Sequence, residues 1–169
     1  MQITEIRTDE TLRELRAHGT PEFPFEYYYD DFNKFSGQSI AWHWHREFEF
    51  VAVDAGPIDC LIGAERLRME IGSGLFINSG AIHRFESTAQ GRMPNILFAP
   101  EFLAERDSLV FRQHILPVLN AGCRFIPLTR GTDAGDAVAT VAVAVSSIVT
   151  TVIIVLGVLL LVPLQPILE

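Results

Sequence analysis

The sequence predicts a mainly β domain, an antiparallel jelly-roll barrel with short flanking helices and an apolar C-terminal segment. From Ser39 onward, turn-forming residues recur about every eight to ten residues, which is the strand spacing of an antiparallel sandwich or barrel. Apolar and other residues alternate between these turns, so each strand is expected to bury one face. No crossover helix fits between the turns, which argues against a parallel sheet.

The N-terminal part is predicted to contain a short helix, an extended arm and an aromatic strand. Thr11 is a typical N-cap residue and Glu14 follows three residues later, so we expect a brief helix to begin there. Pro21 and Pro24 then exclude a helix and favour an extended segment. We expect residues 20–31 to form an arm that ends in an aromatic strand and lies as a lid over the barrel or at its edge.

The clearest hairpin lies in the middle of the chain. Apolar residues alternate along 58–62 and again along 67–71, and Gly63 and Ala64 separate the two runs. This pattern predicts two antiparallel strands with one apolar face.

A helix that covers the barrel is predicted after the strands. Ser108 can cap a helix that runs to Leu119, and Gly122 lies beyond its end. Pro117 falls within its last turns, so we expect a kink or the end of the regular helix there.

Charge divides the chain near Gly131. All 13 lysine and arginine residues lie at or before Arg130, whereas residues 137–162 contain no charged side chain. Glycines and aspartates between these regions are typical of a linker. We therefore expect one domain at 1–131 and, at 132–169, a linker followed by an apolar tail.

The apolar tail allows three interpretations. As a helix, residues 137–162 would be about 39 Å long, enough to cross a hydrocarbon core of roughly 30 Å. Against a membrane anchor, no lysine or arginine flanks the segment closely, and no tryptophan or tyrosine marks an interface. The segment could instead be an element buried against the barrel or a partner subunit, or the product of a slipped reading frame.

Composition limits the classes of binding partner and the cellular compartment that we expect for this chain. A net charge of −8 and a pI near 5.1 argue against a broad basic surface, so we expect no direct nucleic-acid binding by this chain. Cys60 and Cys123 are too few for a disulfide framework, and the N-terminus lacks an apolar signal core. We predict a cytoplasmic protein, with membrane anchoring through 137–162 as the alternative.

Two motifs place metal-ligand side chains at fixed distances from glycines. The first contains Gly37, His43, His45, Glu49 and Gly56, and the second contains Gly72, Asn78, Gly80 and His83. Their spacing resembles the two signature motifs of the cupin superfamily, which implies an RmlC-like jelly-roll barrel. Asn78 stands where that pattern usually has proline, and Ser87 stands where it usually has asparagine. Neither departure falls on a ligand position.

Three imidazoles and one carboxylate, from His43, His45, His83 and Glu49, can surround one divalent ion. This donor set suits zinc, iron, nickel or manganese and leaves coordination positions open for water or a ligand. The same groups could instead form hydrogen bonds with an organic ligand. Phe85 shares a strand face with His83, so we add it to the predicted ligand-binding residues.

Strand parity puts His43, His45 and Glu49 on one face, but distance opposes a single straight strand. Glu49 would then lie about 13 Å from His45, too far for a common ion. We therefore predict a break or bulge at Arg46 and Glu47, with the ligands pointing into the barrel from neighbouring strands. The tryptophans at 42 and 44 have the opposite parity and are expected outside the barrel.

Longer runs of sequence resemble the N-terminal sensor domain of AraC-type transcription regulators over about residues 5–130. The runs are residues 18–32, 42–50, 74–83 and 95–103. The resemblance implies a cupin barrel that binds a small molecule such as a sugar or metabolite, an arm at 20–31 that can fold over it, and dimerisation through helices after the barrel. In that family a separate C-terminal domain with two helix-turn-helix units binds DNA, and this chain is expected to lack it.

Two functions follow from these resemblances. The first is a ligand-sensing and dimerising module without catalytic residues, acting as a homodimer or with a full-length regulator. The alternative is a small metal-dependent cupin enzyme, similar to a dioxygenase or an isomerase. Its candidates for proton transfer are Glu47 and the tyrosines at 27–29.

Overall fold

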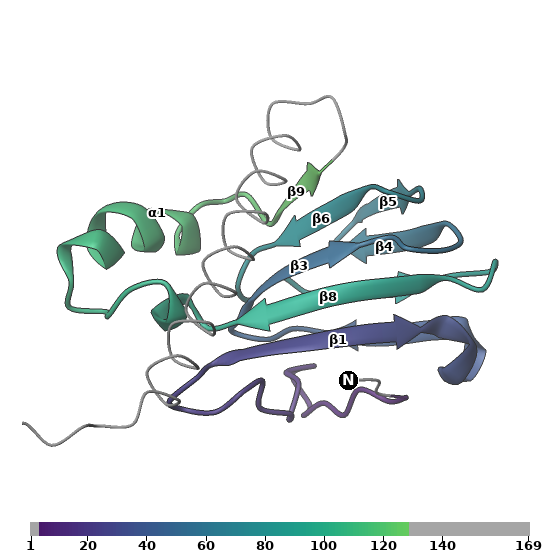
Figure 1. The fold of residues 1–169 in the computed structure, drawn as a ribbon, viewed down its shortest axis with the longest axis horizontal. Coiled ribbons are helices and arrows are strands. Elements are labelled where there is room, and N and C mark those ends of the chain that lie inside the picture. The colour runs from purple at the N-terminus through teal and green to yellow at the C-terminus, as the bar shows by residue number, and fades with distance from the viewer. Residues whose placement is uncertain (1–3, 129–169) are drawn as a thin grey trace, which may run out of the picture.

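Two antiparallel sheets pack face to face in the computed structural model, which describes residues 4–128 (Figure 1). The five-stranded sheet has the spatial order β1 (Phe25–Asp31), β8 (Arg92–Phe98), β3 (Phe48–Ala52), β6 (Gly74–Ile77) and β9 (Phe125–Leu128). The four-stranded sheet has the order β2 (Ser39–His43), β7 (His83–Glu86), β4 (Ile58–Ile62) and β5 (Glu65–Met69). The predicted mainly β jelly roll is confirmed.

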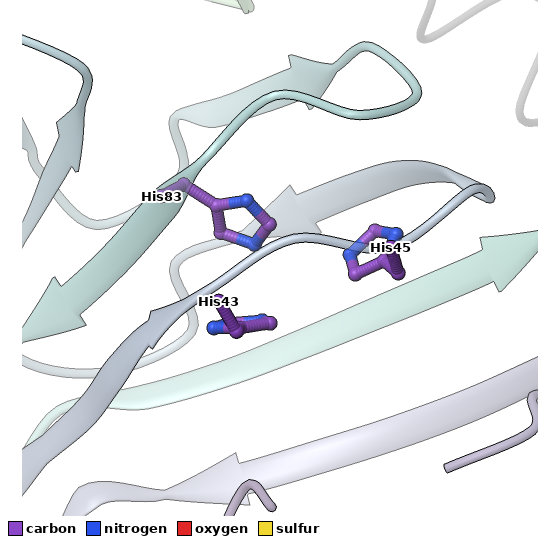
Figure 2. A group of neighbouring side chains, drawn as sticks. All are labelled: His43, His45 and His83. Atoms are coloured by element: carbon purple, nitrogen blue, oxygen red, sulfur yellow. The ribbon is translucent and has the colours of Figure 1, made fainter. Parts of the chain in front are cut away.

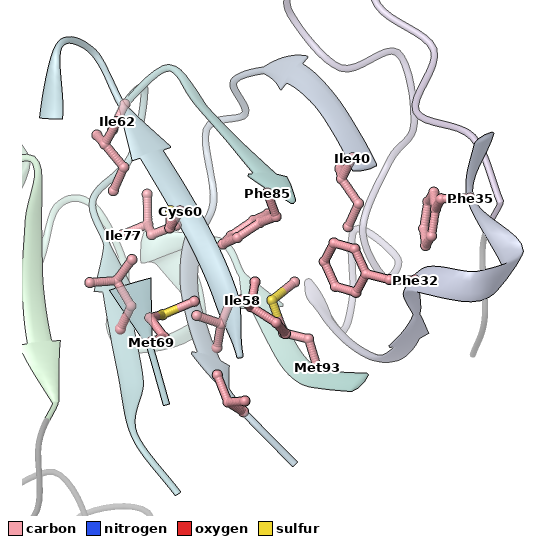
Figure 3. Packing of buried hydrophobic residues seen from close by; sticks show 14 residues of the cluster. Phe32, Phe35, Ile40, Ile58, Cys60, Ile62, Met69, Ile77, Phe85 and Met93 are labelled. Carbon is pink, nitrogen blue, oxygen red and sulfur yellow. The ribbon is translucent and has the colours of Figure 1, made fainter. Parts of the chain in front are cut away.

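The main hydrophobic core fills the space between the two sheets (Figure 3). Ile58, Cys60 and Ile62 are each at most 1% exposed, because alternate residues of β4 point between the sheets. β4 pairs with β5 in the register Cys60↔Leu67, so the predicted hairpin is confirmed.

A second apolar cluster covers the outer face of the five-stranded sheet. Phe48, Phe76 and Phe98 form its buried part, and Ile115 and Leu119 pack on it from the helix. The parity of β3 explains why the sheet is apolar on both faces, since Phe48 and Phe50 belong to the outer cluster and Val51 belongs to the core between the sheets. The expected covering helix is therefore present.

The covering helix is irregular next to Pro117. The Ser108 hydroxyl accepts a hydrogen bond from the Phe111 N–H at 3.1 Å, as expected for a cap. A π-helical turn (η4, Phe111–Ile115) follows and leads into α1 (Leu116–Leu119), and the Leu116 N–H donates to the Phe111 carbonyl. Proline lacks the N–H that would continue a regular ladder, so the widened turn lies where a kink was predicted. Three short 3-10 turns complete the described elements: η1 (Phe32–Lys34), η2 (Ser36–Gln38) and η3 (Pro100–Phe102).

The short helix expected at Thr11 is absent, and this prediction was wrong. The Asp9 carboxylate accepts hydrogen bonds from the N–H groups of Thr11 and Arg13, which closes a tight turn. Leu12 has φ of 67°, a left-handed conformation that a right-handed helix cannot contain. The residues that were expected to cap a helix therefore form a turn. Thr8 and Glu14 form an antiparallel bridge across this turn.

The predicted arm at 20–31 is largely an edge strand. Residues from Phe25 onward form β1, which pairs with β8 along its whole length. The part of the N-terminus that lies against the opening between the sheets is instead the segment 6–18, called the N-terminal strap below. Arg13 of the strap forms a bridge with Trp44, and Trp44 Nε1 donates to the Thr11 carbonyl at 2.9 Å.

The predicted break between the ligand residues is confirmed. β2 ends at His43 and β3 begins at Phe48, and these strands belong to different sheets. The register of β2 with β7 also shifts between Ile40 and His43. Residues 44–47 therefore carry the chain from one sheet to the other, which brings Glu49 back toward the histidines.

The expectations about the linker and the apolar tail at 137–162 lie outside the described residues. Within residues 4–128, no helix combines the length and the apolar character needed to cross a membrane.

Candidate functional site

A small cavity lies between the sheets, with a volume of about 20 Å³. Phe85, Met93 and Leu97 form part of its apolar wall, and the predicted ligands His43, His45 and Glu49 contribute polar groups. This volume is roughly that of one water molecule or one ion. The strap closes the cavity on one side, because Ile6, Glu14 and His18 also line it.

Three of the four predicted metal ligands converge on one point (Figure 2). His43 ends β2, His83 begins β7, and the two residues are directly paired in the sheet register. His45 comes from the segment that connects the sheets. One nitrogen of each ring lies within 4.8 Å of those of the other two, and all three side chains are buried.

Backbone carbonyls fix the tautomer of each imidazole. Nδ1 of His43 lies 2.8 Å from the Ala41 carbonyl, and Nδ1 of His83 lies 2.8 Å from the Ala81 carbonyl. A carbonyl oxygen only accepts, so each Nδ1 carries the proton. His45 Nδ1 makes the same kind of contact at 3.2 Å with the carbonyl of Glu47. In the neutral rings, the Nε2 lone pairs are therefore left free as possible metal ligands.

Glu49 is the fourth predicted ligand, and its carboxylate contacts two of the three rings. Oε2 lies 3.3 Å from His45 Nε2 and 3.1 Å from His83 Nε2. Burial raises the pKa of this carboxyl, but the adjacent imidazoles of His45 and His83 outweigh burial, so the pKa lies below its ordinary value. The pKa of His43 lies well below its ordinary value, first because of burial and then because of the neighbouring imidazoles.

These residues fit a divalent ion. His83 Nε2 is buried without a hydrogen-bond partner, because its approach to Glu49 lacks hydrogen-bond geometry. An Nε2 lone pair facing a carboxylate oxygen is unfavourable unless a cation or a proton lies between them. A metal ion would satisfy the ring nitrogens and the carboxylate together.

The turn before β7 aligns the two motifs. The Gly80 N–H donates to the His45 carbonyl at 2.8 Å, and Ser79 Oγ donates to the Arg46 carbonyl at 2.7 Å. Gly80 has φ of 74°, which favours glycine at this position of the turn. The link holds the His45 backbone next to the strand that carries His83.

Asn78, which replaces the usual proline, joins the barrel to the covering helix. Its Nδ2 donates to the carbonyls of Val118 at 2.8 Å and Cys123 at 3.0 Å. Its Oδ1 accepts the N–H of Ser79 at 2.9 Å. A proline could make none of these bonds, so this departure changes how the helix is attached and leaves the histidines in place.

Sequence reasoning missed the polar groups of the strap. His18 Nε2 lies 3.2 Å from the Glu14 carboxylate, and His18 Nδ1 lies 2.8 Å from the Tyr28 hydroxyl. The His18 ring centroid is 5.6 Å from that of His45, so the strap reaches the histidine cluster. The spacing of four residues between Glu14 and His18 is a possible signal, although Glu14 enters the helix prediction only as part of a capping pattern.

Another missed pair lies on the five-stranded sheet. Asn95 Nδ2 of β8 donates to Asp30 Oδ2 of β1 at 2.7 Å, and both side chains line the cavity. Asp30 Oδ1 is buried and has no hydrogen-bond partner. Burial raises the pKa of Asp30 to about 7, although the hydrogen bond from Asn95 lowers it.

The remaining predicted residues have different surroundings. The Phe85 ring lies 5.4 Å from the His83 ring and lines the cavity. Trp42 and Trp44 are half-buried and lie outside the barrel, as expected, with guanidinium groups over their rings. Glu47 places its carboxylate 3.9 Å from His45 Nδ1, on the side of the ring that faces away from Glu49.

Comparison with known sequences connects this architecture to regulators. A family model described as the AraC-like ligand binding domain matches residues 31–120. An uncharacterised HTH-type transcriptional regulator of Bacillus subtilis, YdeC, is 38% identical over 78 residues, which are 46% of this chain and 27% of that protein. The aligned part of the chain therefore spans about a quarter of the length of this relative.

Solved structures with related folds include three proteins with low sequence identity. A protein of unknown function from Streptococcus pyogenes is 16% identical, with 59% of this chain and 97% of that chain covered and a TM-score of 0.41. The cupin domain of Schizosaccharomyces pombe Cnp3 is 12% identical, with 48% and 58% covered and a TM-score of 0.40. A cupin-2 domain protein from Shewanella frigidimarina is 16% identical, with 48% and 74% covered and a TM-score of 0.36.

Proposed function

We propose, from the premise that this chain belongs to the AraC-like ligand-binding domain family, that it is a sensor whose effector binds in the cavity between the two sheets. The observation that carries the proposal is the cavity itself, a space between the sheets lined by buried polar side chains. Polar groups at a core position destabilise the fold unless they are paired. Their concentration here is typical of a site that recognises a small molecule.

Access to this cavity depends on the strap. The space of about 20 Å³ is too small for a metabolite while the strap is closed. The strap is held by the Asp9 turn, the Trp44 contacts and the Glu14, His18 and Tyr28 network. Effector binding therefore requires the strap to move, and a ligand that favours the open state shifts the equilibrium between the two arrangements.

A divalent ion would be held by His43, His45, His83 and Glu49. When bound, the ion would supply positive charge, and an oxygen atom of the effector could coordinate to it. The protein's own part is to hold the three rings in one tautomer and to exclude bulk water with the strap.

The output of the sensor is a second part of the proposal. We place this domain in a transcription regulator, where a change at the strap alters contacts with a second copy of the chain or with a full-length subunit. The homologous regulator from Bacillus subtilis supports this placement. Sedimentation velocity with and without an identified effector would test it, and an unchanged association state at all concentrations would argue against it.

Binding can be tested by tryptophan fluorescence and thermal melting. A panel of sugars, polyols, amino acids and organic acids is titrated into the protein with and without Zn²⁺ or Mn²⁺. Trp44 contacts the strap, so strap movement should change its emission. We expect at least one compound to give a saturable change and a higher melting temperature, and no binder under any condition would contradict the proposal.

A metal-dependent enzyme is the second candidate, and the histidine cluster is the observation that favours it. Such an enzyme needs an acid or a base beside the reacting atoms. Tyr28 lines the cavity, and its hydroxyl contacts His18 and Arg16. Conversion of a bound compound by the metal-loaded protein, abolished in His83→Ala, would favour the enzyme over the sensor.

A further inference from the structure

We propose that Asp30 and Asn95 form a hydroxyl-binding subsite in the cavity, separate from the three-histidine centre. The inference rests on the proposed function, because it assigns a ligand group to the same cavity. Asp30 lies on β1 and Asn95 on β8, neighbouring strands of the five-stranded sheet, whereas His43 and His83 lie on the four-stranded sheet. Asp30 and Asn95 therefore face the cavity from the five-stranded sheet, as Glu49 of β3 also does, whereas His43 faces it from the four-stranded sheet.

The unsatisfied oxygen of Asp30 is the observation that points to a ligand. Asp30 is only 3% exposed. Asn95 donates a hydrogen bond to Oδ2 of Asp30, whereas Oδ1 has no hydrogen-bond partner. A buried oxygen without a partner destabilises the protein, because it has lost its hydrogen bonds with water and gained none in return. A ligand that hydrogen-bonds to Oδ1 would remove this cost.

The surrounding charges select the kind of group. Glu14, Asp30 and Glu49 contribute carboxyl groups, and no lysine or arginine is found among the described residues that line the cavity. Carboxylate or phosphate groups of a ligand are therefore disfavoured at this wall. The raised pKa of Asp30, about 7, means that both of its protonation forms are present near neutral pH.

A hydroxyl suits both protonation forms of Asp30. It donates to the ionised carboxylate and accepts from the protonated carboxyl, whereas an ammonium group can only donate. The subsite therefore favours a neutral hydroxylated molecule. A hydroxyl of this molecule contacts Asp30 and Asn95, and its other end lies toward the histidines.

The test compares polyol binding by the wild type and by Asp30→Leu/Asn95→Leu, which removes both partners of the pair. Glycerol, erythritol, xylitol and sorbitol are the probes, succinate is the anionic comparison, and Glu65→Leu, at an exposed residue of β5 outside the cavity, is the control. We expect at least one polyol, and not succinate, to bind the wild type and the control. The double variant should bind that polyol at least tenfold more weakly and melt at no lower temperature without ligand.

Other results would overturn the subsite. Polyol affinities that agree within twofold between wild type and double variant would do so, as would a wild type that binds only non-hydroxylated members of the broader panel. In the second case the proposed sensor function survives, whereas a wild type that binds nothing removes both proposals. If the double variant does not fold, Asp30→Ala replaces it, with the same tenfold criterion for polyol affinity.

Discussion

Each histidine at the centre is oriented by its own neighbourhood in the chain. Nδ1 of His43 and of His83 points to the carbonyl two residues earlier, and Nδ1 of His45 points to the carbonyl two residues later. These contacts are local, so they form together with the strands that contain them. One nitrogen of each ring then lies within 4.8 Å of those of the other two, and the Glu49 carboxylate contacts Nε2 of His45 and of His83.

Replacing His83 should abolish high-affinity metal binding. His83→Ala removes one of three converging nitrogens, so we expect Zn²⁺ affinity to fall by at least about 100-fold, beyond the range for loss of an outer-sphere partner. Isothermal titration with Zn²⁺ measures the change. His114→Ala, at an exposed helix position, is the matched control and should bind as the wild type does. Equal affinity in both variants would rule out this centre.

Replacing Asn78 should weaken the attachment of the helix. Asn78→Ala leaves the buried contacts to the Val118 and Cys123 carbonyls unmade, so we expect the free energy of unfolding to fall by about 2 kcal/mol. Urea denaturation gives this value. Asn33→Ala, at an exposed residue, should change it by under about 0.5 kcal/mol. An equal loss of unfolding free energy in both variants would contradict a specific stabilising role of the contacts between Asn78 and the helix.

At the residue scale, the sequence predicted those site residues whose positions follow the spacing of the two motifs. Motif spacing alone named His43, His45, His83 and Glu49, and the structure brings the rings of the three histidines together. Asp30 was not recognised, because its partner Asn95 is 65 residues away and only strand pairing brings them together.

At the scale of elements, local patterns predicted local structure well. Alternation predicted the hairpin of β4 and β5, and a distance argument predicted the break before β3. The strap could not be predicted in this way, because its conformation depends on the distant Trp44. The same capping residues that favour a helix were used by the Asp9 turn.

The strap should be held more firmly at low pH through His18. Burial lowers the pKa of His18, but the hydrogen bond to Glu14 and nearby carboxylates outweigh burial, so the folded pKa exceeds 6.5. The contribution to stability is therefore complete below pH 6.5 and is lost as pH rises through the folded value. We expect the stability difference between wild type and His18→Gln to be larger at pH 6 than at pH 9.

Chemical denaturation at both pH values measures this difference. Subtracting the unfolding free energy of the variant from that of the wild type removes the pH effects of groups that both proteins contain. A difference that grows with pH would contradict the assigned role of His18. His114→Gln should show no such pH dependence, because this side chain is exposed on the helix.

At the scale of the molecule, we predict that the barrel folds without the segment after Gly131. Among the described residues, the two core clusters join both sheets and the covering helix. We therefore expect a chain truncated after Gly131 to fold and to melt within about 5 °C of the full chain, a shift that corresponds to roughly 1 kcal/mol. Differential scanning calorimetry compares the two, and a truncated chain without a cooperative transition would contradict this.

The strand order was beyond sequence reasoning, although the fold class was not. Turn spacing and alternation specify that strands exist and which faces they bury, but the five-stranded sheet places β1 beside β8 and β6 beside β9. Such pairings depend on packing between distant segments. The position of Asp30 beside Asn95 is a consequence of this order, which explains why this pair was missed on the wall that also carries Glu49.

The most direct test of the central claim is nitrogen NMR of the histidine rings during titration with Zn²⁺. If the cavity between the sheets is a binding site centred on His43, His45 and His83, their Nε2 resonances should shift together and saturate at one equivalent, while each Nδ1 remains protonated. The Nε2 resonance of His114 should stay unchanged. Shifts confined to His114, or separate saturation of the three buried rings, would contradict a shared centre.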